Sequence, residues 1–198
     1  ASKEGFDACV IGCFYDTALK DAQEVSGDMI VTAPCVASCD IASALCNRFG
    51  IIVGRQKWVH QMHSTVVANG YENRLSGFYP VGLGVTDFQQ DHAITADRLM
   101  QAGRKAVLED YAEAIILGCT MEIGFNATMA RALDVPVIDP ATAAFLRAEH
   151  LGSHKTACGW IPSRKYSCEA PSEIEMTNLG VFDVDQPFGN RIVVPANS

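Results

Sequence analysis

The chain of 198 residues has 15 Lys and Arg against 23 Asp and Glu, which gives a formal net charge of −8. Proteins that bind nucleic acid through its phosphates need a basic surface, so this charge argues against a nucleic-acid partner. Hydrophobic residues make up 48% of the chain and charged residues 19%, which is typical of a folded globular protein and excludes a disordered one.

Short apolar runs alternate with stretches of helical periodicity as far as residue 151. The predicted strands are Ala8–Gly12, Met29–Thr32, Ile51–Val53, Phe78–Leu83, Ala114–Leu117 and Val135–Ile138. The predicted helices are Thr17–Val25, Cys39–Phe49, Trp58–Asn69, Ala93–Asp110, Gly124–Leu133 and Ala141–Leu151. Asp139-Pro140 is a strong helix start, with a carboxylate at the N-cap and proline at the first helical position. This alternation predicts an α/β fold with mainly parallel sheets.

The segment after Gly152 has a weaker pattern because several prolines interrupt it. Only Gly180–Val184 and Arg191–Val194 resemble strands there. We expect no membrane partner, because no apolar run approaches the roughly 18 residues that a span requires. The first residues also lack the basic and apolar regions of a signal peptide, so we expect a cytoplasmic protein.

The eight cysteines are expected to be free thiols, because disulfides are rare in a reducing cytoplasm. We expect no metal site, since the chain has no Cys-x-x-Cys pair. His60 and His63 could share a helix face, but no acidic or sulfur partner lies close to them in the sequence. The chain also lacks a Gly-x-Gly-x-x-Gly run and a phosphate-binding lysine loop, so we expect no cofactor.

An internal repeat at a single offset of 106 residues is the most informative feature. Ala8–Cys13 aligns with Ala114–Cys119, and Met29–Pro34 aligns with Val135–Pro140. Both copies share a Gly-Cys pair after the first strand and a proline after the second. The repeat predicts two pseudo-equivalent lobes.

Each Gly-Cys pair ends a strand, and ligands bind at the carboxyl edge of a parallel sheet. We therefore expect Cys13 and Cys119 to face each other across one cleft. A thiolate opposite a thiol can remove a proton from one face of a carbon and deliver one to the other face, as inversion requires. The alternative is that a cysteine is only a buried small hydrophobe, and we prefer that interpretation for Cys9 and Cys46.

The loops after the two cysteines contain the predicted substrate-binding residues. Backbone amides of Phe14, Tyr15, Thr120 and Met121 are expected to hydrogen-bond to a thiolate, a substrate carboxylate or an enolate.

Four further residues lie near this expected cleft. Asp16 and Glu122, which come next in each loop, are predicted first as helix caps. Gly54 and Arg55 follow the strand Ile51–Val53 and are predicted to contact the substrate. Arg55 could hold an anionic substrate or lie on a solvated surface.

These motifs resemble the aspartate/glutamate/hydantoin racemase superfamily, most closely its hydantoin and allantoin racemase branch. The residues that carry the resemblance are Gly12–Asp16, Leu117–Met121 and Val135–Asp139. The resemblance implies cofactor-independent enzymes with two Rossmann-like lobes, an active site in the cleft between them, and Cys13 and Cys119 as the acid/base pair.

Family members begin with a further strand and helix ahead of the first Gly-Cys strand. We therefore expect a first lobe of residues 1–46 and 152–198 that lacks them, and a second lobe of residues 47–151.

The leading hypothesis is a racemase or epimerase that inverts the carbon next to a carbonyl in a hydantoin-like or amino-acid substrate. A lyase similar to arylmalonate decarboxylase, an enzyme similar to maleate isomerase and a non-catalytic binding protein derived from a racemase remain alternatives. The expected partner is a small-molecule substrate. The sequence does not define the oligomeric state, and a homo-oligomer is compatible with it.

Overall fold

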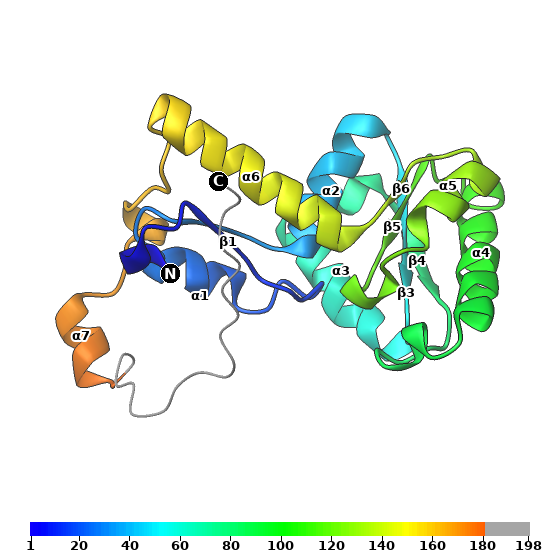
Figure 1. Cartoon of the computed structure of the whole chain (residues 1–198), viewed down its shortest axis with the longest axis horizontal. Coiled ribbons are helices and arrows are strands. Elements are labelled where there is room, and N and C mark those ends of the chain that lie inside the picture. The colour runs from blue at the N-terminus through cyan, green and yellow to red at the C-terminus, as the bar shows by residue number, and fades with distance from the viewer. Residues whose placement is uncertain (181–198) are drawn as a thin grey trace, which may run out of the picture.

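The computed structural model describes residues 1–180, which form two parallel β-sheets joined by helices (Figure 1). Apart from Gly180 itself, the predicted strands Gly180–Val184 and Arg191–Val194 lie outside the described residues. Short 3-10 helices lie at Ser2–Glu4, Gln56–Trp58, Glu72–Arg74, Asp87–Gln89, Thr120–Glu122 and Tyr166–Cys168.

The smaller sheet consists of β1 (Ala8–Val10) and β2 (Ile30–Thr32), which run parallel. Helix α1 (Leu19–Val25) connects these strands, and α2 (Pro34–Leu45) follows β2. A small apolar core lies between α1 and this sheet, and its buried members are Leu19, Met29, Val31 and Ala33.

The larger sheet has the strand order β4-β3-β5-β6, with all strands parallel. Its strands are β3 (Phe49–Val53), β4 (Leu75–Pro80), β5 (Ala114–Leu117) and β6 (Val137–Ile138). Its helices are α3 (Val59–Ala68), α4 (His92–Leu108) and α5 (Asn126–Leu133). Helices α4 and α5 cover one face, whereas α2 and α3 cover the other (Figure 1). Because both faces are covered, β3 and β5 are buried along their whole length.

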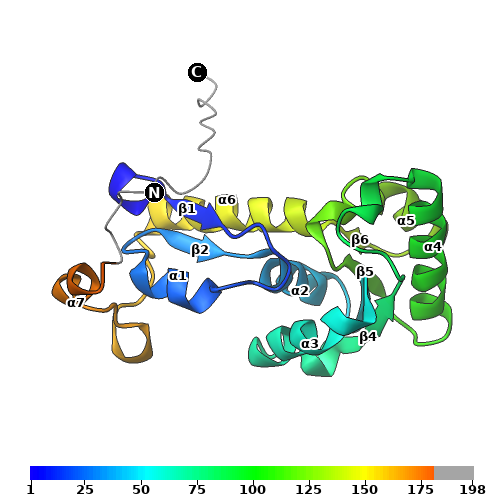
Figure 2. The ribbon, with the colours of Figure 1, turned by 90° about the horizontal axis from the view of Figure 1, so that it is seen from below.

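Helix α6 (Pro140–Cys158) begins beside β6 and then runs along the small sheet, where it contacts β1, β2 and α2 (Figure 2). The predicted start is confirmed, because Asp139 Oδ1 accepts a hydrogen bond of 2.7 Å from the Thr142 amide. The helix continues past its predicted end at Leu151 and stops at Gly159, whose φ of 68° is left-handed. A last short helix, α7, covers Glu173–Asn178.

The strand pairs of the two sheets have the same register when their residue numbers are shifted by the 106 residues of the repeat. Cys9 lies opposite Val31 in the small sheet, and Ile115 lies opposite Val137 in the large one. The predicted fold class, two pseudo-symmetric lobes with mainly parallel sheets, is therefore confirmed. Within residues 1–180, β1 pairs only with β2, whereas its counterpart β5 pairs on both edges. The division into residues 1–46 with 152–198 and residues 47–151 stays a prediction.

Two further predicted elements were wrong in their boundaries. The helix expected at Cys39–Phe49 begins five residues earlier, because Pro34 takes the first helical position after the extended Ala33. Phe49 instead begins β3, where it is fully buried. The strand expected at Phe78–Leu83 lies three residues earlier, as β4, although the Val81 amide still donates to the Val53 carbonyl.

Candidate active site

One cavity of about 240 Å³ receives both Gly-Cys loops. Cys13 reaches it from the loop after β1, and Cys119 reaches it from the end of β5. The full lining is Gly12, Cys13, Phe14, Tyr15, Trp58, Met62, Val85, Gly118, Cys119, Thr120 and Met121. The structure thus brings the two predicted acid/base residues together with the predicted binding residues Phe14, Tyr15, Thr120 and Met121.

The loop of Cys13 is held in place by Asp16. The Asp16 amide donates to the Cys13 carbonyl at 2.9 Å, and the Asp16 carboxylate accepts the amides of Cys35 at 2.8 Å and Val36 at 2.9 Å. Asp16 is thus a helix cap as predicted, but it caps α2 rather than α1, the next helix. Burial raises the pKa of the Asp16 carboxyl to about 6, although the two amide bonds lower it.

The loop of Cys119 lies directly against β3. The Gly118 amide donates to the Ile52 carbonyl at 2.7 Å, and a Cβ on Gly118 would collide with that carbonyl oxygen. Glycine therefore permits a close approach at this position. At the equivalent Gly12, nothing lies within 4 Å of an added Cβ, so no close approach requires glycine there.

The Cys119 thiol is in a less polar environment than water. Burial raises its pKa to about 11, and the neighbouring Glu122 and Cys13 also raise it. The Met121 amide hydrogen-bonds to Cys119 and acts in the opposite direction, which is the role predicted for that amide. Gln89 braces this loop by donating to the Met121 carbonyl at 2.7 Å.

Glu122 is fully buried behind Cys119. Burial raises the pKa of its carboxyl well above the ordinary value, the amides of Gly118 and Cys119 lower it, and Asp139 raises it further. The prediction that Glu122 caps a helix was wrong. It lies inside a 3-10 helix and α5 begins only at Asn126, because the chain takes an extra turn between them.

Three residues of the cavity were missed by the sequence analysis. Trp58 ends the 3-10 helix that leads into α3, Met62 lies one turn further on in α3, and Val85 comes from the loop after β4. Together with Phe14 they make the cavity wall mainly apolar. No motif marks them, because they meet only through the packing of separate elements.

The other two predicted binding residues do not line this cavity. The Trp58 ring packs directly against Gly54. A Cβ on Gly54 would collide with this ring and with the Leu83 carbonyl. Arg55 is exposed, and its guanidinium lies beside Gly84. A direct contact of either residue with substrate stays a prediction.

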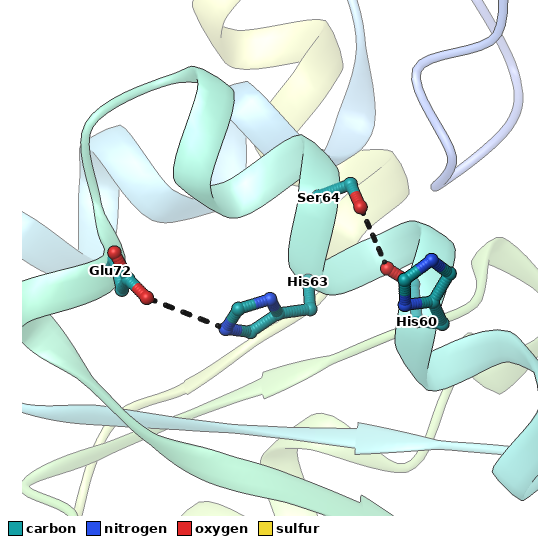
Figure 3. Close-up of polar contacts among 4 residues, drawn as sticks. All are labelled: His60, His63, Ser64 and Glu72. Carbon is teal, nitrogen blue, oxygen red and sulfur yellow. Dashed lines mark hydrogen bonds and ion pairs between the residues drawn. The ribbon is translucent and has the colours of Figure 1, made fainter.

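His60 and His63 do not form a pair of ligands. His63 Nε2 lies 3.8 Å from Glu72 Oε1, and its ring points away from His60 (Figure 3). An acidic partner thus exists, contrary to expectation, because the turn after α3 brings Glu72 back. Across residues 1–180, no three His, Cys, Asp or Glu side chains are grouped as metal ligands would be.

All eight cysteines are free thiols, as predicted. Cys9 and Cys46 are half-buried and pack against apolar cores. Cys46 Sγ, directly after α2, also donates to the Ala42 carbonyl in the last turn of that helix at 3.2 Å. In the same described part of the chain, no helix is both long enough and apolar enough to cross a membrane.

Comparisons with known proteins identify the family of this chain. The family model described as Asp/Glu/Hydantoin racemase matches residues 1–148. The chain belongs to this family. It is 35% identical to the hydantoin racemase of Paenarthrobacter aurescens over 84% of the chain and 69% of that protein. It is also 35% identical to the hydantoin racemase of Pseudomonas sp. (strain NS671), over 74% of the chain and 59% of that protein.

Among solved structures, the allantoin racemase from Klebsiella pneumoniae superimposes with a TM-score of 0.79 at 24% identity. The match covers 86% of this chain and 68% of that one, and it shows a shared fold. The predicted resemblance to the racemase family is therefore confirmed, and with it the assignment to racemase-type isomerases. The substrate and the roles of the two cysteines are not part of these matches.

Proposed function

We propose that this cavity racemises a neutral, hydantoin-like substrate at the carbon next to a carbonyl, with Cys13 and Cys119 as its acid and base. The observation that carries the proposal is the convergence of two pseudo-equivalent thiols on one small cavity. A cofactor-free inversion needs one proton acceptor and one proton donor on opposite faces of a planar intermediate, and the pseudo-symmetry of the lobes supplies such a pair.

The reaction follows from proton transfers alone. The thiolate of one cysteine takes the α-proton, and the electron pair of the broken C–H bond moves into the adjacent carbonyl to form an enolate. The thiol of the other cysteine then protonates the opposite face and becomes the thiolate. Amides of the two loops would stabilise the enolate oxygen. The hydrogen bond from the Met121 amide to Cys119 supports this role.

The lining of the cavity favours a neutral ring over a free amino acid. None of its residues is Lys, Arg, Asp or Glu, so an ionised carboxylate would be buried without a matching charge. The apolar surfaces of Trp58, Met62 and Val85 suit a hydrophobic substituent on the reacting carbon. These features support a substituted hydantoin as the substrate class.

The test follows the α-hydrogen. Each enantiomer of 5-benzylhydantoin is incubated with the protein in heavy water, with optical activity and the loss of the α-proton signal recorded against a protein-free control. The wild type should racemise both enantiomers with deuterium uptake.

The variants Cys13→Ala and Cys119→Ala should lose net racemisation by about 10²–10⁴-fold. Each should still exchange the α-proton of one enantiomer, with opposite preference, without inverting it. Cys158→Ala, which removes an exposed thiol at the end of α6, is the matched control. Full racemisation by either cavity variant would refute the two-cysteine mechanism, whereas a wild type inactive on hydantoins but active on an arylmalonate would favour the lyase.

A further inference from the structure

The loop after β1 places the Thr17 hydroxyl against the candidate base Cys13. Thr17 Oγ1 lies 3.6 Å from Cys13 Sγ with the geometry of a hydrogen-bond donor. Such a bond stabilises a thiolate more than a thiol, because hydrogen bonds to a charged acceptor are the stronger ones. Thr17 does not line the cavity, so it reaches the chemistry only through the sulfur.

Other residues of the loop force Thr17 into this position. Asp16 and Ala18, on either side of Thr17, have left-handed φ values of 52° and 54°, which residues other than glycine rarely adopt. The hydrogen bonds that the Asp16 carboxylate accepts from the Cys35 and Val36 amides offset this local strain. The loop is thus clamped from α2 in the conformation that turns Thr17 back toward Cys13.

The second loop has no equivalent of this contact. The residue at the 106-residue offset from Thr17 is Ile123, which has no hydroxyl and is 53% exposed. In the part of the chain that the structure describes, Cys119 accepts the Met121 amide but no side-chain hydroxyl. Burial also disfavours its thiolate. The two pseudo-equivalent sulfurs therefore have different environments.

We propose that Thr17 is a positioning residue that stabilises the thiolate of Cys13 over that of Cys119, so that Cys13 is the base with which a turnover begins. The inference rests on the proposed two-cysteine racemase. After Cys13 has taken the α-proton and Cys119 has donated its own, proton exchange of both sulfurs with water restores the starting state. The resting enzyme is then poised for the enantiomer whose α-hydrogen faces Cys13.

Within residues 1–180, Tyr15 and Cys119 are titratable groups whose charges interact with Cys13. Burial, followed by the charges of the two cysteines, raises the pKa of the Tyr15 phenol above its ordinary value, so Tyr15 stays neutral near neutral pH. Cys119 also stays a thiol there, because its pKa is about 11.

The experiment compares Thr17→Val, which loses the hydroxyl at nearly constant shape, with Thr17→Ser, which keeps it. The folded protein is alkylated with iodoacetamide at a series of pH values in the absence of substrate. After digestion, mass spectrometry of the peptide that contains Cys13 gives the extent of its alkylation at each pH. The exposed Cys158 in the same samples is the reference thiol. The midpoint for Cys13 should rise by about one pH unit in Thr17→Val and stay at the wild-type value in Thr17→Ser.

An unchanged midpoint in Thr17→Val would overturn the inference, and so would an equal rise in both variants, because serine retains the donor. Exchange in heavy water gives a second readout. At neutral pH, Thr17→Val should slow α-proton exchange about tenfold for the enantiomer that Cys13 deprotonates and leave the other unchanged. A protein that shows the alkylation shift but does not racemise hydantoins would refute the proposed function and keep the role of Thr17.

Discussion

Gly118 lies so close to the Ile52 carbonyl that the two residues leave no room for a Cβ. This contact sets how far the Cys119 loop stands from the large sheet, since the Gly118 amide donates to the same oxygen. Gly12, the equivalent glycine in the first loop, has open space around it. The pseudo-symmetry of the two loops therefore does not extend to their steric requirements.

The first prediction uses this difference. Gly118→Ala should lower the free energy of unfolding by about 2 kcal/mol or more, because the added methyl group must push the loop or β3 aside. Gly12→Ala should change it by less than about 0.5 kcal/mol. Urea unfolding of the two variants gives the comparison. Equal stability of the two variants would contradict the assigned role of Gly118.

The second prediction concerns pH and Asp16. The folded protein raises the pKa of this carboxyl from 3.8 to about 6, so the folded state binds its proton more tightly than the unfolded state. The stabilisation from Asp16 is therefore fully present below pH 3.8 and is lost as pH rises through about 6. Above that window the wild type should have lost roughly 3 kcal/mol from this group.

Asp16→Asn is the control for this effect, because an amide cannot titrate. Urea unfolding of both proteins at several values between pH 4 and 7 should show the wild type losing stability with rising pH relative to the variant. A constant difference in stability across this window would count against the raised pKa. The variant also loses one of two acceptors for the α2 amides, which adds an offset but no slope.

The third prediction concerns Glu122. Because burial raises the pKa of its carboxyl and so favours the neutral form, the neutral amide of Glu122→Gln should keep the melting temperature within a few degrees of the wild type. Glu122→Ala should cost about 2–4 kcal/mol, since it leaves a void in a fully buried position. Thermal and urea unfolding measure both changes. A glutamine variant as unstable as the alanine variant would indicate that the carboxyl is ionised.

The sequence predicts the parts of this molecule that depend on neighbouring residues. The Gly-Cys pairs, the shared prolines and the start of α6 at Asp139-Pro140 are local signals, and the structure bears out the fold that they predict. The link from Asp16 to α2 is not predictable in this way, because it joins residues 19 and 20 positions apart. The burial of Glu122 likewise depends on the packing of surrounding elements.

The apolar wall of the cavity shows the same limit more sharply. Trp58 carries no motif, and its position depends on a glycine four residues earlier, Gly54, whose missing side chain leaves room for the indole ring. Met62 joins Trp58 because the two lie one helical turn apart, but that spacing is equally typical of an ordinary core. Only the fold shows that this helix end faces the two cysteines.

The last prediction assigns substrate preference to this wall. If Trp58 packs on the substituent of the reacting carbon, Trp58→Ala should lower kcat/KM for 5-benzylhydantoin by about 10–100-fold and for 5-methylhydantoin much less, because only the larger group buries surface on the ring. Trp58→Phe should restore most of the difference. Initial racemisation rates measure both substrates in parallel. An equal loss on both would mean that Trp58 only supports the loops, through its packing against Gly54.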